Sequence, residues 1–432
     1  MTQILFRGGS VLDAAAGVLL EGHDVLVEGD RIKEVSDRSI RATNAAVIQL
    51  HGRVLMPGLI DAHVHIYLSE LNLTLMSGIP VSYVVARSGP AMRAMLDRGF
   101  TSVRDNGGAD WGIREAVNSG VLDGPRLFIA GRVISQTGGH GDYRSRTVSD
   151  SQPCNCCSGL DMFAHVVDGV PAVLHAAREE LRKGADHIKI MISGGVASPH
   201  DPLESLQFTD DEIKAAVQAA ESWGKYTVAH AYSAPAIRRG VECGVRSIEH
   251  GNLIDECTAK FVAEHHAFVV PTLVTYDSMA RRGRELGLPE KTLEKNKKVL
   301  EAGLRSLEIC KAAGVELGFG TDLLGPLQQD QSREFLIRAE VLSPVEIIRS
   351  ATVTNARLMG KENELGVIRP AALADLLVVE GNPFKDLNVL QDQGAHILMI
   401  MKGGVFYKSC APSAQVSEPR KNHEKPLDNS FK

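Results

Sequence analysis

Residues 57–66 are Pro57-Gly58-Leu59-Ile60-Asp61-Ala62-His63-Val64-His65-Ile66. The apolar run after Pro57-Gly58 is typical of a buried strand, and alternate side chains of a strand point to the same face. His63 and His65 therefore lie together at the carboxyl end of this strand, the end at which parallel α/β barrels keep their chemistry. Two imidazoles in this arrangement can bind one metal ion. The alternative is a chance pair of histidines in a strand, and the neighbouring strands are needed to choose.

The middle of the chain alternates apolar strands with amphipathic helices, which is the pattern of parallel βα units. Helical periodicity is clear in 170–183, 211–223 and 293–313, and Thr209 or Asp210 is the expected N-cap of the second helix. Eight strands are predicted, at 59–66, 101–105, 126–134, 187–192, 227–230, 247–250, 268–275 and 317–322. This count predicts an α/β fold, a (β/α)8 TIM-like barrel.

Both ends of the chain have a different pattern. Short alternating segments separated by Gly and Asp occupy residues 4–46, and similar segments return at 375–383 and 396–404. We therefore predict that the two ends form one small β-sandwich domain and that the barrel is inserted between them. The predicted boundaries are 1–56 and 366–412 for the sandwich, 57–365 for the barrel and 413–432 for a disordered, polar tail.

Length and composition exclude several classes of protein. The chain has 432 residues, more than the roughly 250 of a simple barrel, so an extra domain is expected. No apolar run approaches the ~20 residues of a membrane span. The net charge of -6 and the scattered basic residues provide no footprint for nucleic acid. A strand-like segment begins at Ile4, so no signal peptide is expected and the location is predicted to be cytoplasmic, or periplasmic or secreted if a leader has been removed.

The chain has seven cysteines, and three of them, Cys154, Cys156 and Cys157, are crowded together. There is no second CxxC motif and no nearby histidine pair, so a zinc finger is excluded. Cysteines this close in sequence do not easily pair with one another, and we predict that they are reduced thiols in a loop.

Lys189 lies inside an apolar predicted strand, His187-Ile188-Lys189-Ile190-Met191-Ile192. A buried ammonium is costly and needs a reason. Carboxylation of the amine by carbon dioxide would convert Lys189 into an anionic oxygen ligand able to bridge two metal ions. The alternative is a lysine paired with a carboxylate of the barrel, because buried ion pairs do occur.

Three further polar residues stand at predicted strand ends: His230, His250 and Asp322. A single histidine at such a place is as often a satisfied core residue as a ligand. Four histidines and a buried lysine at the same end of a barrel make coincidence a poor explanation. A carboxylate at that rim can bind metal and also move a proton, so Asp322 is the candidate catalytic residue.

The chain resembles the binuclear metal-dependent amidohydrolases, whose pattern is HxH, a carboxylated lysine, two single histidines and an aspartate after strand eight. All six positions are filled, and the resemblance extends to Ala374-Asp375-Leu376-Leu377-Val378 in the second chain-end segment. The segments Ser198-Pro199, Gln207-Phe208-Thr209 and His250-Gly251-Asn252 resemble the imidazolonepropionase-like branch that contains Xaa-Pro dipeptidases and ochratoxin A-hydrolysing amidohydrolases.

The resemblance implies a role for each position. His63, His65 and Asp322 would hold one ion, His230 and His250 the other, and carboxylated Lys189 would bridge them. Two Zn²⁺ ions suit this mixture of imidazole and oxygen ligands.

Related carboxypeptidase-like members place a histidine after strand three and a tyrosine after the strand-five histidine, and both bind a substrate carboxylate. His140 and Tyr232 match these positions here. The alternatives are a loop histidine and a packing tyrosine.

The expected activity is metal-dependent hydrolysis of an amide bond that releases a C-terminal amino acid, as in the conversion of ochratoxin A to ochratoxin α and phenylalanine. A second hypothesis keeps the site but changes the substrate to a cyclic amide or an imidazolone-like ring, which would leave His140 and Tyr232 without a role. A third, a non-catalytic scaffold, conflicts with the complete ligand set. The expected partners are a small amide or N-acyl amino acid and further copies of the chain, since relatives are oligomeric and octamers occur among them.

Overall fold

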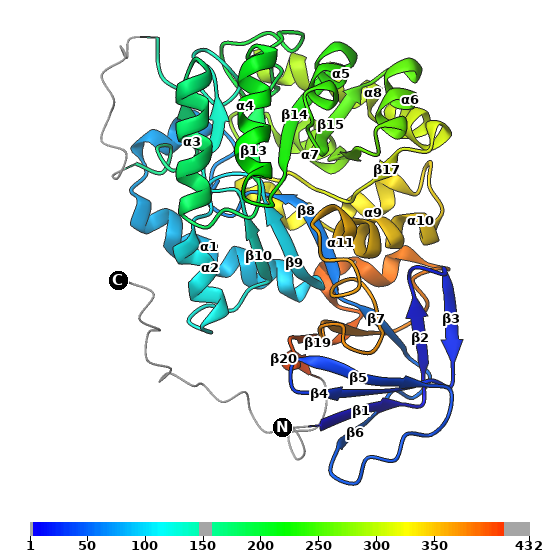
Figure 1. Ribbon diagram of the computed structural model, residues 1–432. Coiled ribbons are helices and arrows are strands. Elements are labelled where there is room, and N and C mark those ends of the chain that lie inside the picture. The colour runs from blue at the N-terminus through cyan, green and yellow to red at the C-terminus, as the bar shows by residue number, and fades with distance from the viewer. Residues whose placement is uncertain (1–2, 147–157, 410–432) are drawn as a thin grey trace.

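The computed structural model describes residues 3–146 and 158–409 (Figure 1). The predictions for the crowded cysteines and for the tail 413–432 concern residues outside these ranges. At the centre are two parallel sheets, with strand orders β10-β9-β8 and β12-β11-β13-β14-β15-β16-β17. Their strands are β8 (Leu59–Val64), β9 (Phe100–Asp105), β10 (Arg126–Ile129), β11 (Val133–Ser135), β12 (Ala164–Val166), β13 (Ile188–Met191), β14 (Thr227–Ser233), β15 (Ser247–Leu253), β16 (Phe268–Val270) and β17 (Glu316–Leu317).

Backbone hydrogen bonds outside the ladders join these two sheets. The Ala62 amide donates to the Phe319 carbonyl and the Asp322 amide donates to the His63 carbonyl, both at 2.8 Å, so the segment after β17 lies beside β8. At the other junction the Asp186 amide donates to the Ile129 carbonyl at 2.7 Å. The predicted α/β class with parallel strands is confirmed, although the strands are divided between two sheets.

Several predicted strand boundaries are wrong. The strand expected at 126–134 is two strands, β10 and β11, which belong to different sheets. The strand expected at 268–275 ends at Val270, and helix α7 begins at Leu273. The strand expected at 317–322 pairs with β16 only through Leu317, and the residues after it are hydrogen-bonded to β8, with a positive φ of 52° at Asp322. Apolar composition predicted these segments but not the residues at which ladder pairing stops.

Helices cover the outer face of the larger parallel sheet, and residues of α3 to α6 share an apolar core with β13, β14 and β15 (Figure 1). The predicted periodic helices exist with slightly different ends. Thr209, and not Asp210, caps α4 through a capping box with Glu212. Helix α8 ends at Ala313, and the residue that caps it, Gly314, has a φ of 75°, which suits glycine. The helices are α1 (Val81–Asp97), α2 (Trp111–Asn118), α3 (Val170–Arg182), α4 (Asp210–Glu221), α5 (Ala234–Glu242), α6 (Glu256–Glu264), α7 (Leu273–Arg282), α8 (Glu290–Ala313), α9 (Arg333–Arg338), α10 (Pro344–Arg349) and α11 (Asn355–Leu358).

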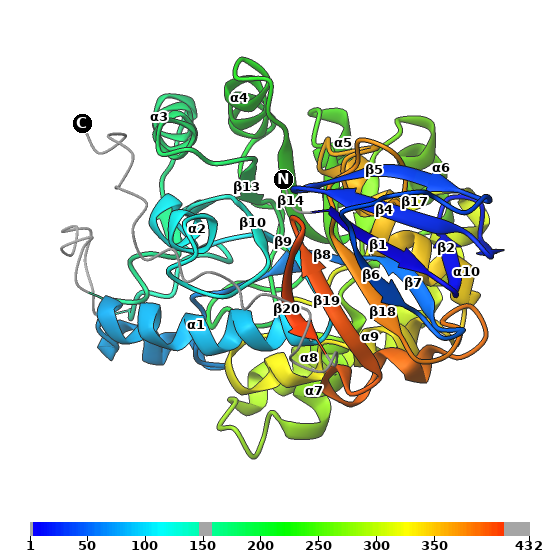
Figure 2. The ribbon, with the colours of Figure 1, turned by 90° about the horizontal axis from the view of Figure 1, so that it is seen from below.

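The two chain ends form two further sheets, ordered β5-β4-β1-β6 and β20-β19-β18-β7-β2-β3. Figure 2 shows β19 and β20 of the second end beside strands of the first, and β18 pairs antiparallel with β7. Ile4, Phe6 and Val25 from the first end share one apolar core with Leu376 and Val378 from the second. The strands are β1 (Gln3–Arg7), β2 (Ser10–Asp13), β3 (Val18–Glu21), β4 (Asp24–Glu28), β5 (Arg31–Ser36), β6 (Ala46–Gln49), β7 (Val54–Pro57), β18 (Leu376–Val379), β19 (Ile397–Lys402) and β20 (Val405–Ser409).

Within residues 3–146 and 158–409, none of the helices combines the length and the apolar character that crossing a bilayer requires.

Candidate metal centre and active site

One pocket lies at the carboxyl ends of the parallel strands. Its wall combines polar groups with the apolar side chains of Leu68, Phe163 and Met279, among others. The pocket brings together all eight residues that the sequence nominated: His63, His65, His140, Lys189, His230, Tyr232, His250 and Asp322.

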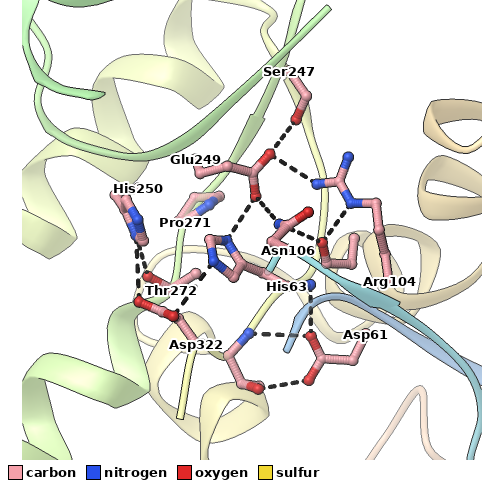
Figure 3. Close-up of polar contacts among 12 residues, drawn as sticks. Asp61, His63, Arg104, Asn106, Ser247, Glu249, His250, Pro271, Thr272 and Asp322 are labelled. Atoms are coloured by element: carbon pink, nitrogen blue, oxygen red, sulfur yellow. Dashed lines mark hydrogen bonds and ion pairs between the residues drawn. The ribbon is translucent and has the colours of Figure 1, made fainter. Parts of the chain in front are cut away.

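Asp322 is at the centre of the polar part of the pocket. Its Oδ1 lies 3.1 Å from His65 Nε2. Figure 3 shows its contacts with two other imidazoles: Oδ1 lies 3.4 Å from His63 Nε2, and Oδ2 lies 3.9 Å from His250 Nδ1. Burial opposes ionisation of this carboxyl, but the surrounding imidazoles outweigh it and lower its pKa. An ionised carboxylate facing three imidazoles is suited to a cation.

Three of the six predicted metal ligands form a tight set. Ligand atoms of His63, His250 and Asp322 all lie within 4.8 Å of one another, so this set spans the two groups of ligands that the resemblance assigns to separate ions. His65 Nε2 contacts the Asp322 carboxylate of this set. Lys189 and His230 line the same pocket but are not among the three residues with mutually close ligand atoms. The polar wall therefore extends from the HxH pair toward His230.

The HxH imidazoles have defined orientations. His65 Nδ1 lies 2.9 Å from the Gly107 carbonyl oxygen, which only accepts, so Nδ1 carries the proton and Nε2 faces Asp322. His63 Nδ1 lies 2.7 Å from a carboxylate oxygen of Glu249. Burial lowers the pKa of His63 well below its usual range, which favours the neutral ring that binds metals.

Lys189 is 1% exposed, and its Nζ has no hydrogen-bond partner among the residues that the structure describes. The alternative prediction, a lysine in an ion pair with a barrel carboxylate, has no such pair to support it in the described part of the chain. Burial lowers the pKa of Lys189 to about 8. Burying an amine without a hydrogen-bond partner costs free energy of folding unless another group binds it.

His230 is surrounded by rings. Its centroid lies 4.1 Å from that of His140 and 4.6 Å from that of His250. His230 Nε2 donates to the Gly194 carbonyl at 3.1 Å, which leaves Nδ1 as the nitrogen free to bind a metal. Burial lowers the pKa of His230 well below its usual range.

His250 and Asp322 both have positive φ angles, 76° and 52°, which residues other than glycine seldom adopt. Such strain persists where surrounding contacts impose it, and it is common at functional sites. At His250 it interrupts the alternation of β15, because Glu249 and His250 are neighbours in sequence and yet both contact His63.

His140 and Tyr232 lie on either side of His230, with Tyr232 4.8 Å from it between ring centroids. His140 Nδ1 is 2.8 Å from Ser198 Oγ, and Tyr232 OH is 2.9 Å from Tyr276 OH. Burial lowers the pKa of His140 to about 4 and raises that of Tyr232, so both rings are neutral near pH 7. Both rings line the pocket.

The loop that supports His140 depends on residues that the sequence analysis missed. A Cβ at Gly195 would lie 1.9 Å from His140 Cε1, so this close approach requires glycine. The buried Lys295 Nζ donates to the carbonyls of Gly195, Ser198 and Asp201 at 2.7–2.9 Å. No local pattern links Lys295 on α8 to this loop, since they are almost 100 residues apart.

Other missed residues hold the metal-ligand segments. Asp61 accepts hydrogen bonds from the His63 amide and from the amide and hydroxyl of Thr321, and thereby ties β8 to the segment that presents Asp322 (Figure 3). Burial raises the pKa of Asp61 to about 6. An acidic residue inside an apolar strand was the available signal for Asp61. Tyr276, which lies 3.0 Å from His250 Nδ1, carried no such signal.

Comparison with known proteins identifies the family to which the chain belongs. The profile of the Amidohydrolase family matches residues 54–406, so the chain belongs to this family. Members of the family that resemble it in structure have an α/β fold with a TIM-like barrel, in agreement with the parallel sheets described above.

Three individual proteins illustrate the similarity within this family. The chain is similar to ochratoxinase of Aspergillus niger, with 30% identity over 370 residues that cover 82% of the chain and 76% of the relative. A crystal structure of an amidohydrolase is 52% identical with a TM-score of 0.92, covering 94% of this chain and 99% of the other. A prolidase complexed with N-methylphosphonate-L-proline is 50% identical with a TM-score of 0.92, covering 94% and 100%.

These relatives confirm the resemblance to the ochratoxinase-like and dipeptidase-like amidohydrolases. The chain is a hydrolytic enzyme that acts on amide bonds.

Proposed function

We propose that the enzyme is a metal-dependent amidohydrolase that cleaves the amide bond before a C-terminal amino acid and releases that amino acid. The observation that carries the proposal is the shared pocket, in which the six candidate ligands are continuous with His140 and Tyr232. The ligands account for hydrolysis, and the two donors account for the free carboxylate of the leaving group. The prolidase and ochratoxinase relatives support peptidase-like hydrolysis.

The donor set fits two zinc ions. His63, His65 and Asp322 would hold one ion, His230 and His250 the other, and carboxylated Lys189 would bridge them. The buried Nζ of Lys189 has no hydrogen-bond partner among residues 3–146 and 158–409, and a carboxyl group on this nitrogen would supply oxygen atoms for the metal ions. When bound, such ions lower the pKa of a water molecule and polarise a substrate carbonyl.

Residues of the chain would handle the protons and the substrate. Asp322, as the general base, would take a proton from the attacking water and pass it to the departing nitrogen. His140 and Tyr232 would bind the carboxylate of the leaving amino acid through neutral donors. Their neutral state near pH 7 means that this binding would not depend on a charged histidine.

The apolar part of the pocket supports a substrate with an apolar group next to the amide, since Leu73, Met191 and Phe163 line it. Ochratoxin A, an amide of phenylalanine, has this character. A screen of N-acyl amino acids and dipeptides, with ochratoxin A included and released amines quantified, tests the proposal. Hydrolysis confined to cyclic amides would contradict it.

Removal of metal is expected to abolish activity. Dialysis against a chelator should reduce hydrolysis of the best N-acyl amino acid to background, and zinc should restore it, because the ligands must bind metal for the site to work. The measurement is turnover together with metal content, for which we expect about two ions per subunit. Full turnover by metal-free protein would refute the mechanism.

Removal of a side chain that binds the substrate carboxylate is expected to slow hydrolysis of acid substrates more than hydrolysis of amide substrates. His140→Ala or Tyr232→Phe should lower kcat/KM for an N-acyl amino acid. The decrease should correspond to a loss of roughly 1.5–3 kcal/mol of transition-state stabilisation, the scale of a hydrogen bond to a charged group. The corresponding amino acid amide, which lacks the charge, should change little. Esterified ochratoxin A should likewise react poorly with the unchanged enzyme.

Tyr407→Phe, on strand β20 of the chain-end sheets, provides the control and should affect neither substrate. Equal losses on acid and amide would mean that His140 and Tyr232 shape the metal site or the fold instead.

Two further proposals concern the domain architecture of the enzyme and its oligomeric state. We propose that the parallel strands of 57–365 form a closed (β/α)8 barrel and that 1–56 and 366–412 form a β-sandwich, supported by the bonds between β8 and the segment after β17 and by the shared core of the chain ends. We also propose a homo-oligomer, which light scattering of the purified protein would test.

A further inference from the structure

Glu249 lies directly behind His63, on the side away from Asp322 (Figure 3). It comes from β15 and its side chain is completely buried, at 0% exposure. Four side-chain donors converge on its two oxygens. His63 Nδ1 and Asn106 Nδ2 contact Oε2 at 2.7 and 3.1 Å, and Arg104 Nη2 and Ser247 Oγ contact Oε1 at 2.8 and 2.6 Å.

This pattern determines the protonation of His63. An ionised carboxylate only accepts hydrogen bonds, so the His63 nitrogen facing it must carry a proton. A neutral His63 ring then has its proton on Nδ1 and its lone pair on Nε2. That Nε2 is the atom that points to Asp322, at 3.4 Å. Glu249 thus selects the tautomer that leaves the correct nitrogen free for a metal.

The carboxylate itself is held rigidly. Arg104 is also completely buried, and its Nε donates to the Ala62 carbonyl, so the guanidinium is anchored to β8 beside the HxH segment. Asn106, which follows β9, donates to Glu249 from a second direction. With its acceptor sites occupied, Glu249 cannot rotate away from His63 without leaving buried donors unpaired.

The two HxH histidines differ in what supports them. His65 donates to a neutral backbone carbonyl, that of Gly107, whereas His63 donates to an anion. A charged acceptor makes a stronger hydrogen bond and raises the basicity of the imidazole as a ligand. The position of His63 should therefore depend on one replaceable side chain, while that of His65 depends on the backbone.

We propose that Glu249 is a positioning residue for the metal centre: its carboxylate holds His63 as the Nδ1–H tautomer with Nε2 toward the metal, and so sets how tightly the ion at the HxH pair is bound. This inference rests on the proposed metal-dependent function. It concerns metal affinity, and Glu249 touches neither the substrate nor the reacting atoms.

The test compares two buried glutamates. Glu249→Gln keeps the shape of the side chain and removes the charge. Glu334→Gln is the matched control, because Glu334 is equally buried and bonds Arg338 at 2.6 Å, in a pair that does not line the pocket. Metal-free protein is titrated with Co²⁺ against a competing chelator, and the visible absorption spectrum reports on ligand geometry. Thermal unfolding of each metal-free variant measures stability separately.

We expect Glu249→Gln to weaken binding of one Co²⁺ ion by about 10- to 100-fold, the effect typical of losing such a partner, and to change the absorption spectrum. Glu334→Gln should lower the unfolding temperature and leave Co²⁺ affinity and spectrum unchanged. Because Glu249→Gln also leaves Arg104 without its carboxylate, the double variant Glu249→Gln/Arg104→Met removes both charges and should show the same weakened binding.

The inference is overturned if Glu249→Gln, or the double variant where the single variant does not fold, binds two ions with unchanged affinity and spectrum. It is also overturned if Glu334→Gln weakens binding equally, since the effect would then come through stability. If the unchanged protein binds neither Co²⁺ nor Zn²⁺, the proposed function itself is refuted. If the unchanged protein and Glu249→Gln both bind these ions tightly, only the inference about Glu249 is refuted.

Discussion

Asp322→Asn is expected to lower kcat for an N-acyl amino acid by roughly 10²- to 10⁴-fold, the contribution of one general acid-base residue. An amide cannot accept and return the proton. The fold should tolerate the change, because asparagine is close in size to aspartate and is among the few residues that adopt the positive φ found at position 322. Catalysis should therefore fall without a comparable loss of stability.

Single-turnover kinetics and thermal unfolding together check this expectation. Asp277→Asn is a suitable control, since Asp277 also pairs with cations, Arg281 and Arg333, but does not line the pocket. It should leave kcat unchanged. If Asp322→Asn turns over at the rate of the unchanged enzyme, the general base is another residue.

Lys189→Met is expected to remove most of the hydrolytic activity without destabilising the metal-free protein. Methionine fills a similar volume but cannot be carboxylated, so the bridge between the two ions is lost. The buried Nζ makes no hydrogen bond to any residue that the structure describes. Replacing an unpaired buried polar group with an apolar one should leave the free energy of unfolding unchanged or raise it by up to about 1–3 kcal/mol.

Lys295→Met is the matched control for that experiment. Lys295 is also buried, but its Nζ donates to three carbonyls, so the same substitution should lower the unfolding temperature of the metal-free protein. The measurements are turnover, zinc content and thermal unfolding of both variants. Wild-type turnover and zinc content in Lys189→Met would show that no lysine bridge exists.

Much of the candidate site could be predicted because its signals are local. The spacing of His63 and His65 follows from the alternation of a strand, and both side chains do lie near Asp322. Lys189 was conspicuous because charge is rare in an apolar strand, and it is buried in the structure. A motif of this kind needs only one segment to be recognised.

The segment after β17 could not be predicted from such local signals. Apolar residues and glycines predicted a strand through Asp322, but ladder pairing stops at Leu317. The backbone there is held by Asp61 and by the His63 carbonyl, which are some 260 residues away in sequence. Pairing with so distant a segment leaves no trace in local composition.

The sequence by itself determined the class of chemistry and the order of the donors, because residue type sets what a side chain can bind and strand periodicity sets which donors share a face. Glu249 was decided only by the tertiary structure. Alternation along β15 would send Glu249 and His250 to opposite faces, and both reach His63 because His250 adopts a φ of 76° under contacts from other strands. Proton position on His63 likewise follows from a carboxylate 186 residues away, which only folding brings within 2.7 Å.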